Sequence, residues 1–113
     1  MSQQEIKELE ANMKDLQEMI DLGNSLEKLL KNRDFKKVIE KEYLHEEAVR
    51  LVQLKADSNM QSEQAQKRVL RDIDAIGSFT QFLDLVRQKA DAAKDAMGEC
   101  EDALAELEEG TEA

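Results

Sequence analysis

A long run of core-type residues, spaced alternately three and four apart, most constrains what this chain can fold into. This spacing places every member on one face of a single helix, as in a coiled-coil seam. At about 1.5 Å per residue such a helix is roughly 48 Å long, which exceeds the width of a small globular domain. We therefore expect part of the face to be covered by a partner. The run consists of Ile76, Phe79, Leu83, Val86, Ala90, Ala93, Met97, Cys100, Leu104 and Leu107.

The composition of the 113-residue chain favours long helices over a β-sheet with its turns. It has no proline, four glycines and only 4% aromatic residues, so we expect an all-α protein. The chain begins without the apolar stretch of a secretory signal, and no window resembles a membrane span. These features predict a cytoplasmic protein without a membrane contact. The single cysteine, Cys100, cannot form an internal disulfide and is expected to pack in the core.

Turn and capping residues divide a single helical domain, residues 1–113, into three helices. We expect them at about 6–31, 35–57 and 62–108, with a flexible acidic tail at 109–113. Short turns would fold the helices up, down and up, so that the first and third are parallel. The expected fold is an elongated three-helix bundle with a long C-terminal coiled-coil helix.

Three local signals accompany these helices. Gly23 interrupts the apolar face of the first helix and marks a bend or a close helix contact. Asp34 is positioned to cap the second helix, which has a predicted bend near His45. Ser62 opens the third helix.

The third helix is nearly twice as long as the others, so its second half should project beyond the bundle. Counted from the shared base, it passes the top of the first helix near Arg87. Exposing its apolar face would cost several kcal/mol, at about 25 cal/mol per Å². The predicted protein interface therefore comprises Leu83, Val86, Ala90, Ala93, Met97, Cys100, Leu104 and Leu107.

Charge is unevenly distributed along a chain whose net charge is −10. Residues 95–113 contain eight acids and no lysine or arginine, whereas six cations in residues 28–41 face only Asp34 and Glu40. A neighbour's acidic end could lie against this basic turn, in a head-to-tail or symmetric assembly. The predicted charged interaction surface comprises Lys28, Lys31, Arg33, Lys36, Lys37, Lys41, Glu99, Glu101, Asp102, Glu106, Glu108 and Glu109.

Other interpretations of these charges remain open. The acidic end could be a solvated face, or it could imitate DNA and occupy a basic host protein. Direct nucleic-acid binding is disfavoured by the net charge and by the lack of a recognised binding motif around the six cations.

Catalytic and metal-binding motifs are incomplete. His45-Glu46 begins like a zinc motif, but Val49 stands where the second histidine is required. Asp57-Ser58-Asn59 begins like a calcium loop, but Ser62 replaces its glycine. We therefore expect no enzyme activity, no cofactor and no metal.

The segment from Phe35 to Leu51 resembles the middle of small acidic helical proteins encoded among the virion and packaging genes of tailed bacteriophages. The resemblance lies in a Phe-x-x-Val-Ile, then Tyr-Leu, then Glu-Ala-x-Arg-Leu pattern. Such proteins often have glycine before the Tyr-Leu pair, where this chain has Glu42. The resemblance implies a protein made in the bacterial host cytoplasm that serves as a minor virion or head-assembly component.

These inferences predict a non-enzymatic structural or assembly protein. Its expected partners are further copies of itself, another virion protein or a host protein. The alternative is a phage-encoded inhibitor or DNA mimic that binds a host protein through its acidic C-terminal helix.

Overall fold

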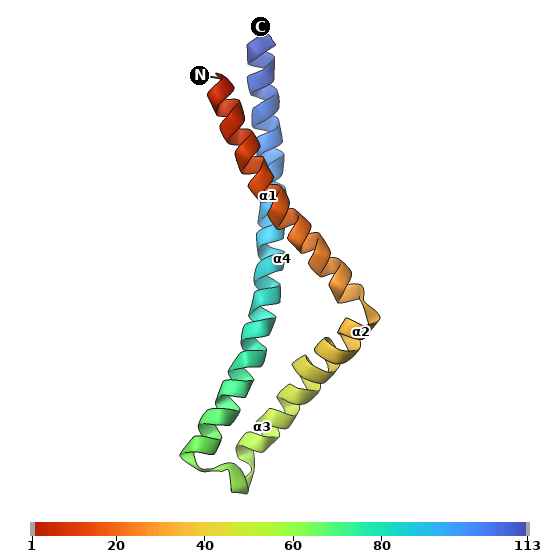
Figure 1. Cartoon of the computed structure of the whole chain (residues 1–113), viewed down its shortest axis with the longest axis vertical. Helices are drawn as coiled ribbons and strands as arrows, with labels where there is room; N and C mark the ends of the chain where they lie inside the picture. The colour runs from red at the N-terminus through yellow and green to blue at the C-terminus, as the bar shows by residue number, and fades with distance from the viewer. Residues whose placement is uncertain (1, 113) are drawn as a thin grey trace. The chain divides into compact units, whose positions relative to one another are not determined.

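A computed structural model describes residues 2–112 of the chain. Its elements are α1 (Ser2–Lys31), α2 (Arg33–Phe35), the π-helix η1 (Lys36–Glu47), α3 (Ala48–Ala56), the 3-10 helix η2 (Ser58–Met60) and α4 (Glu63–Glu112). Helices account for all regular structure in this range, and α4 is the longest at 50 residues (Figure 1). The predicted all-α class and long C-terminal helix are confirmed.

The end of α4 and the division of the chain differ from the sequence prediction. Helix α4 continues to Glu112, past its predicted end near residue 108, and residue 113 lies outside the described range. The flexibility of the acidic tail stays a prediction. The chain divides into two compact units, where we expected one domain. Unit 1 comprises Met1–Leu26 and Leu85–Ala113, and unit 2 comprises Glu27–Asp84. The boundary between them falls within α1 and α4.

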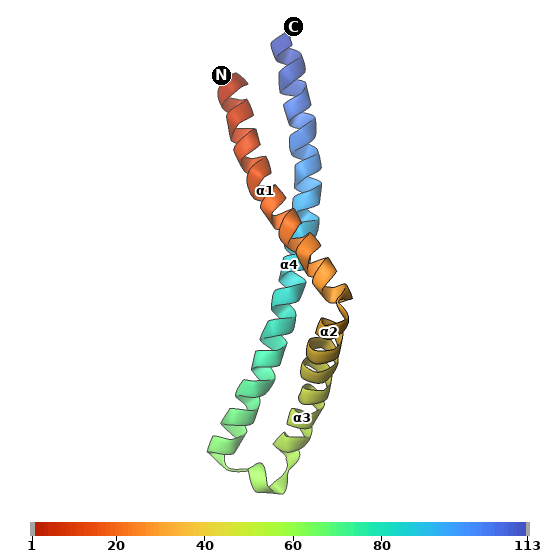
Figure 2. The same ribbon diagram turned by 45° about the vertical axis from the view of Figure 1, so that its right-hand side comes forward.

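In unit 1, α1 packs against the second half of α4 in the antiparallel direction. The Asn12 amide donates a hydrogen bond of 3.5 Å to the Cys100 sulfur, and Gly23 approaches Ala90. Residue numbers therefore increase along α1 as they decrease along the contacting part of α4. Figures 1 and 2 show the start of α1 beside the end of α4. The predicted parallel arrangement of the first and last helices is wrong, because α1 covers the half of α4 that was expected to project.

Within unit 1 the two helices approach closely where Gly23 meets Ala90. A Cβ atom built on Gly23 would lie 2.3 Å from the Cβ of Ala90, far inside van der Waals contact. Gly23 is buried, and Ala90 is 3% exposed. The glycine thus marks a close helix contact, one of the two roles that the sequence predicts for it.

In unit 2, the helical segment formed by α2, η1 and α3 packs against the first part of α4 (Figure 2). The rings of Tyr43 and Phe79 meet edge to face, with centroids 6.1 Å apart. Leu51 and Val69 are the most deeply buried side chains, at 2% and 1% exposure. These contacts identify the covered side of the segment.

The spacing of the covered residues explains why the middle of this segment is a π-helix. Phe35, Ile39, Leu44 and Ala48 are all half-buried. Phe35 and Ala48 are separated by about three turns of a π-helix, at about 4.4 residues per turn. In an α-helix they would be separated by about 3.6 turns and would lie on opposite sides. The π-helix therefore keeps these apolar residues on one side, and it replaces the predicted bend near His45.

Two turns join the segment to α1 and α4. Asn32 has an extended backbone, and its side-chain oxygen accepts hydrogen bonds from the N–H groups of Asp34 and Phe35, each 3.0 Å. Asn32 is thus the N-cap, rather than the predicted Asp34, which lies inside α2. At the second turn the Ser62 hydroxyl accepts a bond of 3.2 Å from the Ala65 N–H, as predicted.

Two glutamines complete the second turn by donating hydrogen bonds to backbone carbonyls at the end of α3 and in the turn itself. Gln61 donates to the carbonyl oxygens of Lys55 and Asp57 at 2.9 and 2.7 Å. Gln66 donates to those of Lys55 and Met60 at 2.9 and 2.7 Å. The two bonds to the Lys55 carbonyl satisfy the end of α3 without a glycine C-cap.

Substituting Gly23 should test the close contact in unit 1. Gly23→Ala forces its Cβ against Ala90, an overpacking that costs about 1–3 kcal/mol. This loss exceeds the gain of about 0.5–1 kcal/mol from replacing a helical glycine by alanine. We expect a lower free energy of unfolding in urea denaturation. Gly77→Ala is the matched control, because nothing lies within 4 Å of its added Cβ. It should stabilise the protein, and equal effects from both substitutions would contradict the close approach.

Candidate interaction surface

The predicted interface residues of α4 lie on one face of that helix and are already covered within the chain. Val86, Ala90, Ala93 and Cys100 are buried. The remaining four, Leu83, Met97, Leu104 and Leu107, are half-buried. The expected bare face at the second half of α4 is therefore absent, because α1 packs on it. The use of these eight residues as an interface with another protein stays a prediction, and it would require α1 to move away from α4.

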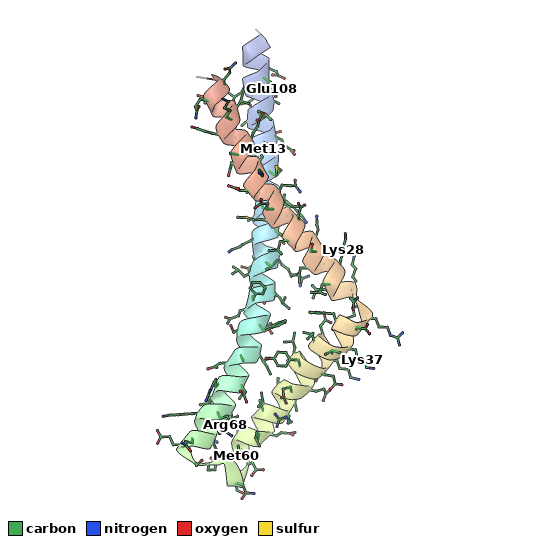
Figure 3. All side chains as sticks on the ribbon, in the orientation of Figure 1. Met13, Lys28, Lys37, Met60, Arg68 and Glu108 are labelled. Atoms are coloured by element: carbon green, nitrogen blue, oxygen red, sulfur yellow. The ribbon has the colours of Figure 1, made fainter. Side chains whose placement is uncertain are left out.

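The predicted acidic residues are exposed, and the structure adds further acids to them. Glu99, Glu101, Asp102, Glu106, Glu108 and Glu109 all face solvent on α4. Because α1 is antiparallel to α4, residues 2–12 lie beside this end, as the labels N, C and Glu108 indicate (Figures 1 and 3). Residues 1–12 contain three acids and one lysine, and residues 95–112 contain eight acids and no base. These two segments together hold all ten excess negative charges of the chain.

A surface concavity of 430 Å³ lies at this acidic end of unit 1. Leu9 and Leu107 are half-buried and form its apolar part, whereas the carboxylates of Glu5 and Glu8 are exposed. We call it the acidic concavity, and its lining residues are Glu5, Glu8, Leu9, Asn12 and Leu107. The sequence prediction missed it because the first helix was expected to run parallel to the last. The sequence did contain a sign of this acidic surface, because Glu5 and Glu8 are three residues apart and lie near Leu9 on the same helix.

The six predicted cations belong to unit 2 and are all exposed. Lys28 and Lys37 lie on either side of the turn at Asn32 (Figure 3). Leu29 stands among these cations with 45% of its surface exposed, and Val38 with 57%. We call residues 28–41 the basic segment. It combines a net positive charge with uncovered apolar side chains.

Large apolar side chains remain exposed in both units. Each unit is built mainly of two packed helical segments, so the outward sides of those segments have no cover. A concavity of 330 Å³ at the junction of η1 and α3 is lined by His45, Ala48, Val49, Val52 and Gln53. The exposed large apolar residues are Met19, Leu22, Leu29, Val38, Val49, Val52, Leu70, Phe82 and Leu85.

An ion pair lies beside a second open depression of unit 2. The Arg50 guanidinium donates two hydrogen bonds to the Glu47 carboxylate, of which the one from Nη2 is 3.1 Å. The hydrogen bond from Arg50 lowers the pKa of Glu47 below its ordinary value, and the pair in turn raises the pKa of Arg50. The depression has a volume of 520 Å³ and is lined by Val38, Glu42, Tyr43, Glu46, Glu47 and Arg50.

Within residues 2–112, no three His, Cys, Asp or Glu side chains are placed to hold a metal ion. His45 is exposed and lines the concavity at the junction of η1 and α3. No helix in the described range is long and apolar enough to cross a membrane.

No protein-family model, curated protein or solved structure matches this chain significantly.

The Glu47–Arg50 pair can be tested by titration. Arg50→Gln removes the charged donor, so the pKa of Glu47 should rise toward its ordinary value in an NMR pH titration. Because the pKa of Glu47 is lower in the folded than in the unfolded state, the ion pair stabilises the folded protein at pH values above the unfolded-state pKa. This stabilisation is lost as the pH falls through the folded-state pKa. The effect on unfolding should be small because the pair is exposed. Arg68→Gln is the control, and an unchanged Glu47 pKa in Arg50→Gln would contradict the pairing.

Proposed function

We propose that this protein is a non-enzymatic structural or assembly protein that self-associates or docks on another virion or host protein. The observation that carries the proposal is the set of nine exposed large apolar side chains among residues 3–110, whose side chains the structure describes. Four of them, Val52, Phe82, Val38 and Leu22, expose more than half of their surface. Leaving such side chains in water forgoes stabilisation of about 25 cal/mol per Å² of apolar area, which association would recover.

The proposed setting is a tailed bacteriophage, in which the protein would be a minor component of the virion or of head assembly. This setting is supported by the resemblance of residues 35–51 to helical proteins encoded among phage virion and packaging genes. The bacterial host cytoplasm is then the proposed place of synthesis and action.

A second candidate function is inhibition of a host protein through the acidic end of unit 1. It is favoured by the gathering of all ten excess negative charges on residues 1–12 and 95–112, which lie together in unit 1. A dense array of carboxylates can occupy a basic surface that normally binds nucleic-acid phosphates.

Self-association should be visible by sedimentation equilibrium of the purified chain. We expect an average mass above 12.9 kDa, the mass of one chain. The association should strengthen with concentration in the range on the order of micromolar, because it follows mass action. A single species of monomer mass at every concentration would contradict self-association.

The two functions predict different locations during infection. An assembly component should be recovered at constant stoichiometry in purified phage particles by quantitative mass spectrometry. An inhibitor should be missing from particles and should co-purify with a host protein from infected cells. The major capsid protein serves as the positive control for particle recovery. Absence from particles together with host-protein capture would favour the inhibitor.

A further inference from the structure

We propose that two copies of this chain associate through one face of unit 2, with each copy contributing the same face. The proposal rests on the self-association proposed above and names the surface that mediates it. We call this surface the α3–α4 face. It consists of the residues that line the concavity at the junction of η1 and α3, together with one leucine of α4: His45, Ala48, Val49, Val52, Gln53 and Leu70.

The centre of the α3–α4 face is apolar and uncovered. Val52 exposes 62% of its surface, the largest fraction for any large apolar side chain among residues 3–110. Val49 and Leu70 each expose 43%. Covering such side chains with a second apolar surface stabilises a complex by about 25 cal/mol per Å² of apolar area.

Val52 and Leu70 lie on the same side of unit 2, although they belong to different helices. Each directly follows one of the two most deeply buried side chains, which are Leu51 in α3 and Val69 in α4. In an α-helix each residue is rotated by about 100° from the one before it. Because α3 and the first part of α4 run in opposite directions (Figure 2), these rotations carry Val52 and Leu70 to the same side.

The same two residues also lie at nearly the same level along the helices. The rings of Tyr43 and Phe79 meet edge to face and fix which residues are opposite each other. Val52 comes nine residues after Tyr43, and Leu70 comes nine residues before Phe79. The two exposed side chains therefore belong to one apolar patch that spans both helices. An exposed apolar patch is characteristic of a protein interface.

The distribution of charge selects a second copy as the partner. No residue of the α3–α4 face carries a formal charge at neutral pH. Unit 2 contains eleven cations and eleven acids, so its net charge is zero and unit 1 carries the whole net charge of −10. Two copies therefore repel each other least when they meet through unit 2.

The charges beside the face are also suited to a contact of the face with itself. Lys55 is three residues from Val52, and Asp74 is four residues from Leu70, so each lies within about one helical turn of the apolar patch. When α3 of one copy lies along α4 of the other, the lysine and the aspartate bring opposite charges together. A contact between identical faces is isologous, and it closes as a dimer.

Paired charge substitutions in the full-length chain test this contact. V52E/L70E and V52K/L70K each place like charges across the contact. Sedimentation velocity at about 0.05 M salt should show association weakened about tenfold or more in either variant alone. Mixing the two variants in equal amounts should restore association, because the glutamates of one copy then face the lysines of the other. A contact with a different surface would not be restored by mixing.

Matched controls place the same charges elsewhere on α4. Gln64 and Ala75 are exposed and lie about 120–140° around the helix from Leu70. Q64E/A75E and Q64K/A75K should associate as the unmodified chain does. Equal weakening by these controls would show that net charge rather than the α3–α4 face decides association, and the proposal would be wrong.

The remaining outcomes separate this proposal from the proposed function. If the unmodified chain associates and V52E/L70E and V52K/L70K leave it unchanged, or if mixing fails to restore association, the contact is wrong and self-association stands. If the unmodified chain is monomeric at about 0.05 M and about 0.5 M salt, both the contact and self-association are wrong. Circular dichroism checks the helical content of each variant. If a double variant loses helical content, V52E and V52K replace the pair in the same mixing test.

Discussion

The apolar seam of α4 is the interaction on which both units depend. It supplies Val69 and Ile76 to unit 2 and Val86, Ala90, Ala93 and Cys100 to unit 1, all of them buried. A helix with one continuous apolar face requires cover along its whole length. In unit 1 that cover is α1, and in unit 2 it is the segment formed by α2, η1 and α3. The seam is thus covered within the chain, and its use as an interface with another protein stays a prediction.

The two covering segments solve the packing problem in different ways. Helix α1 keeps ordinary α-helical spacing and comes close to α4 by means of Gly23, which leaves room for Ala90. The second segment has apolar residues that recur at intervals of four and five, from Phe35 to Ala48. A π-helix over Lys36–Glu47 keeps them on the covered side, where Tyr43 meets Phe79. Side-chain packing thus decides the backbone form, although a π-helix is intrinsically rare.

The antiparallel pairing in unit 1 also creates the electrostatic character of the protein. It places the first turns of α1 beside the end of α4, and the acids of both then belong to one end. Their mutual repulsion disfavours contact between two such ends and favours a contact with cations. The basic segment is the largest concentration of cations in the sequence. The same separation of charge supports both assembly and binding to a basic host surface as functions.

The sequence by itself determined the helical class, the long final helix with its seam, the turns near Asn32 and Ser62, and the special position of Gly23. These features depend on local spacing and capping, which act over a few residues. The charge counts of the acidic end of α4 and of the basic segment are likewise properties of the sequence alone.

Only the tertiary structure decided which helix covers which part of the seam. Short turns are compatible with several packing orders, and the up-down-up order that they suggested places α1 parallel to α4. The observed order depends on contacts between residues far apart in the sequence, such as Asn12 with Cys100 and Gly23 with Ala90. The acidic concavity follows from that order, because Leu9 and Leu107 come from opposite ends of the chain. Local patterns do not encode such pairings, since each apolar face can pack against any face of similar shape.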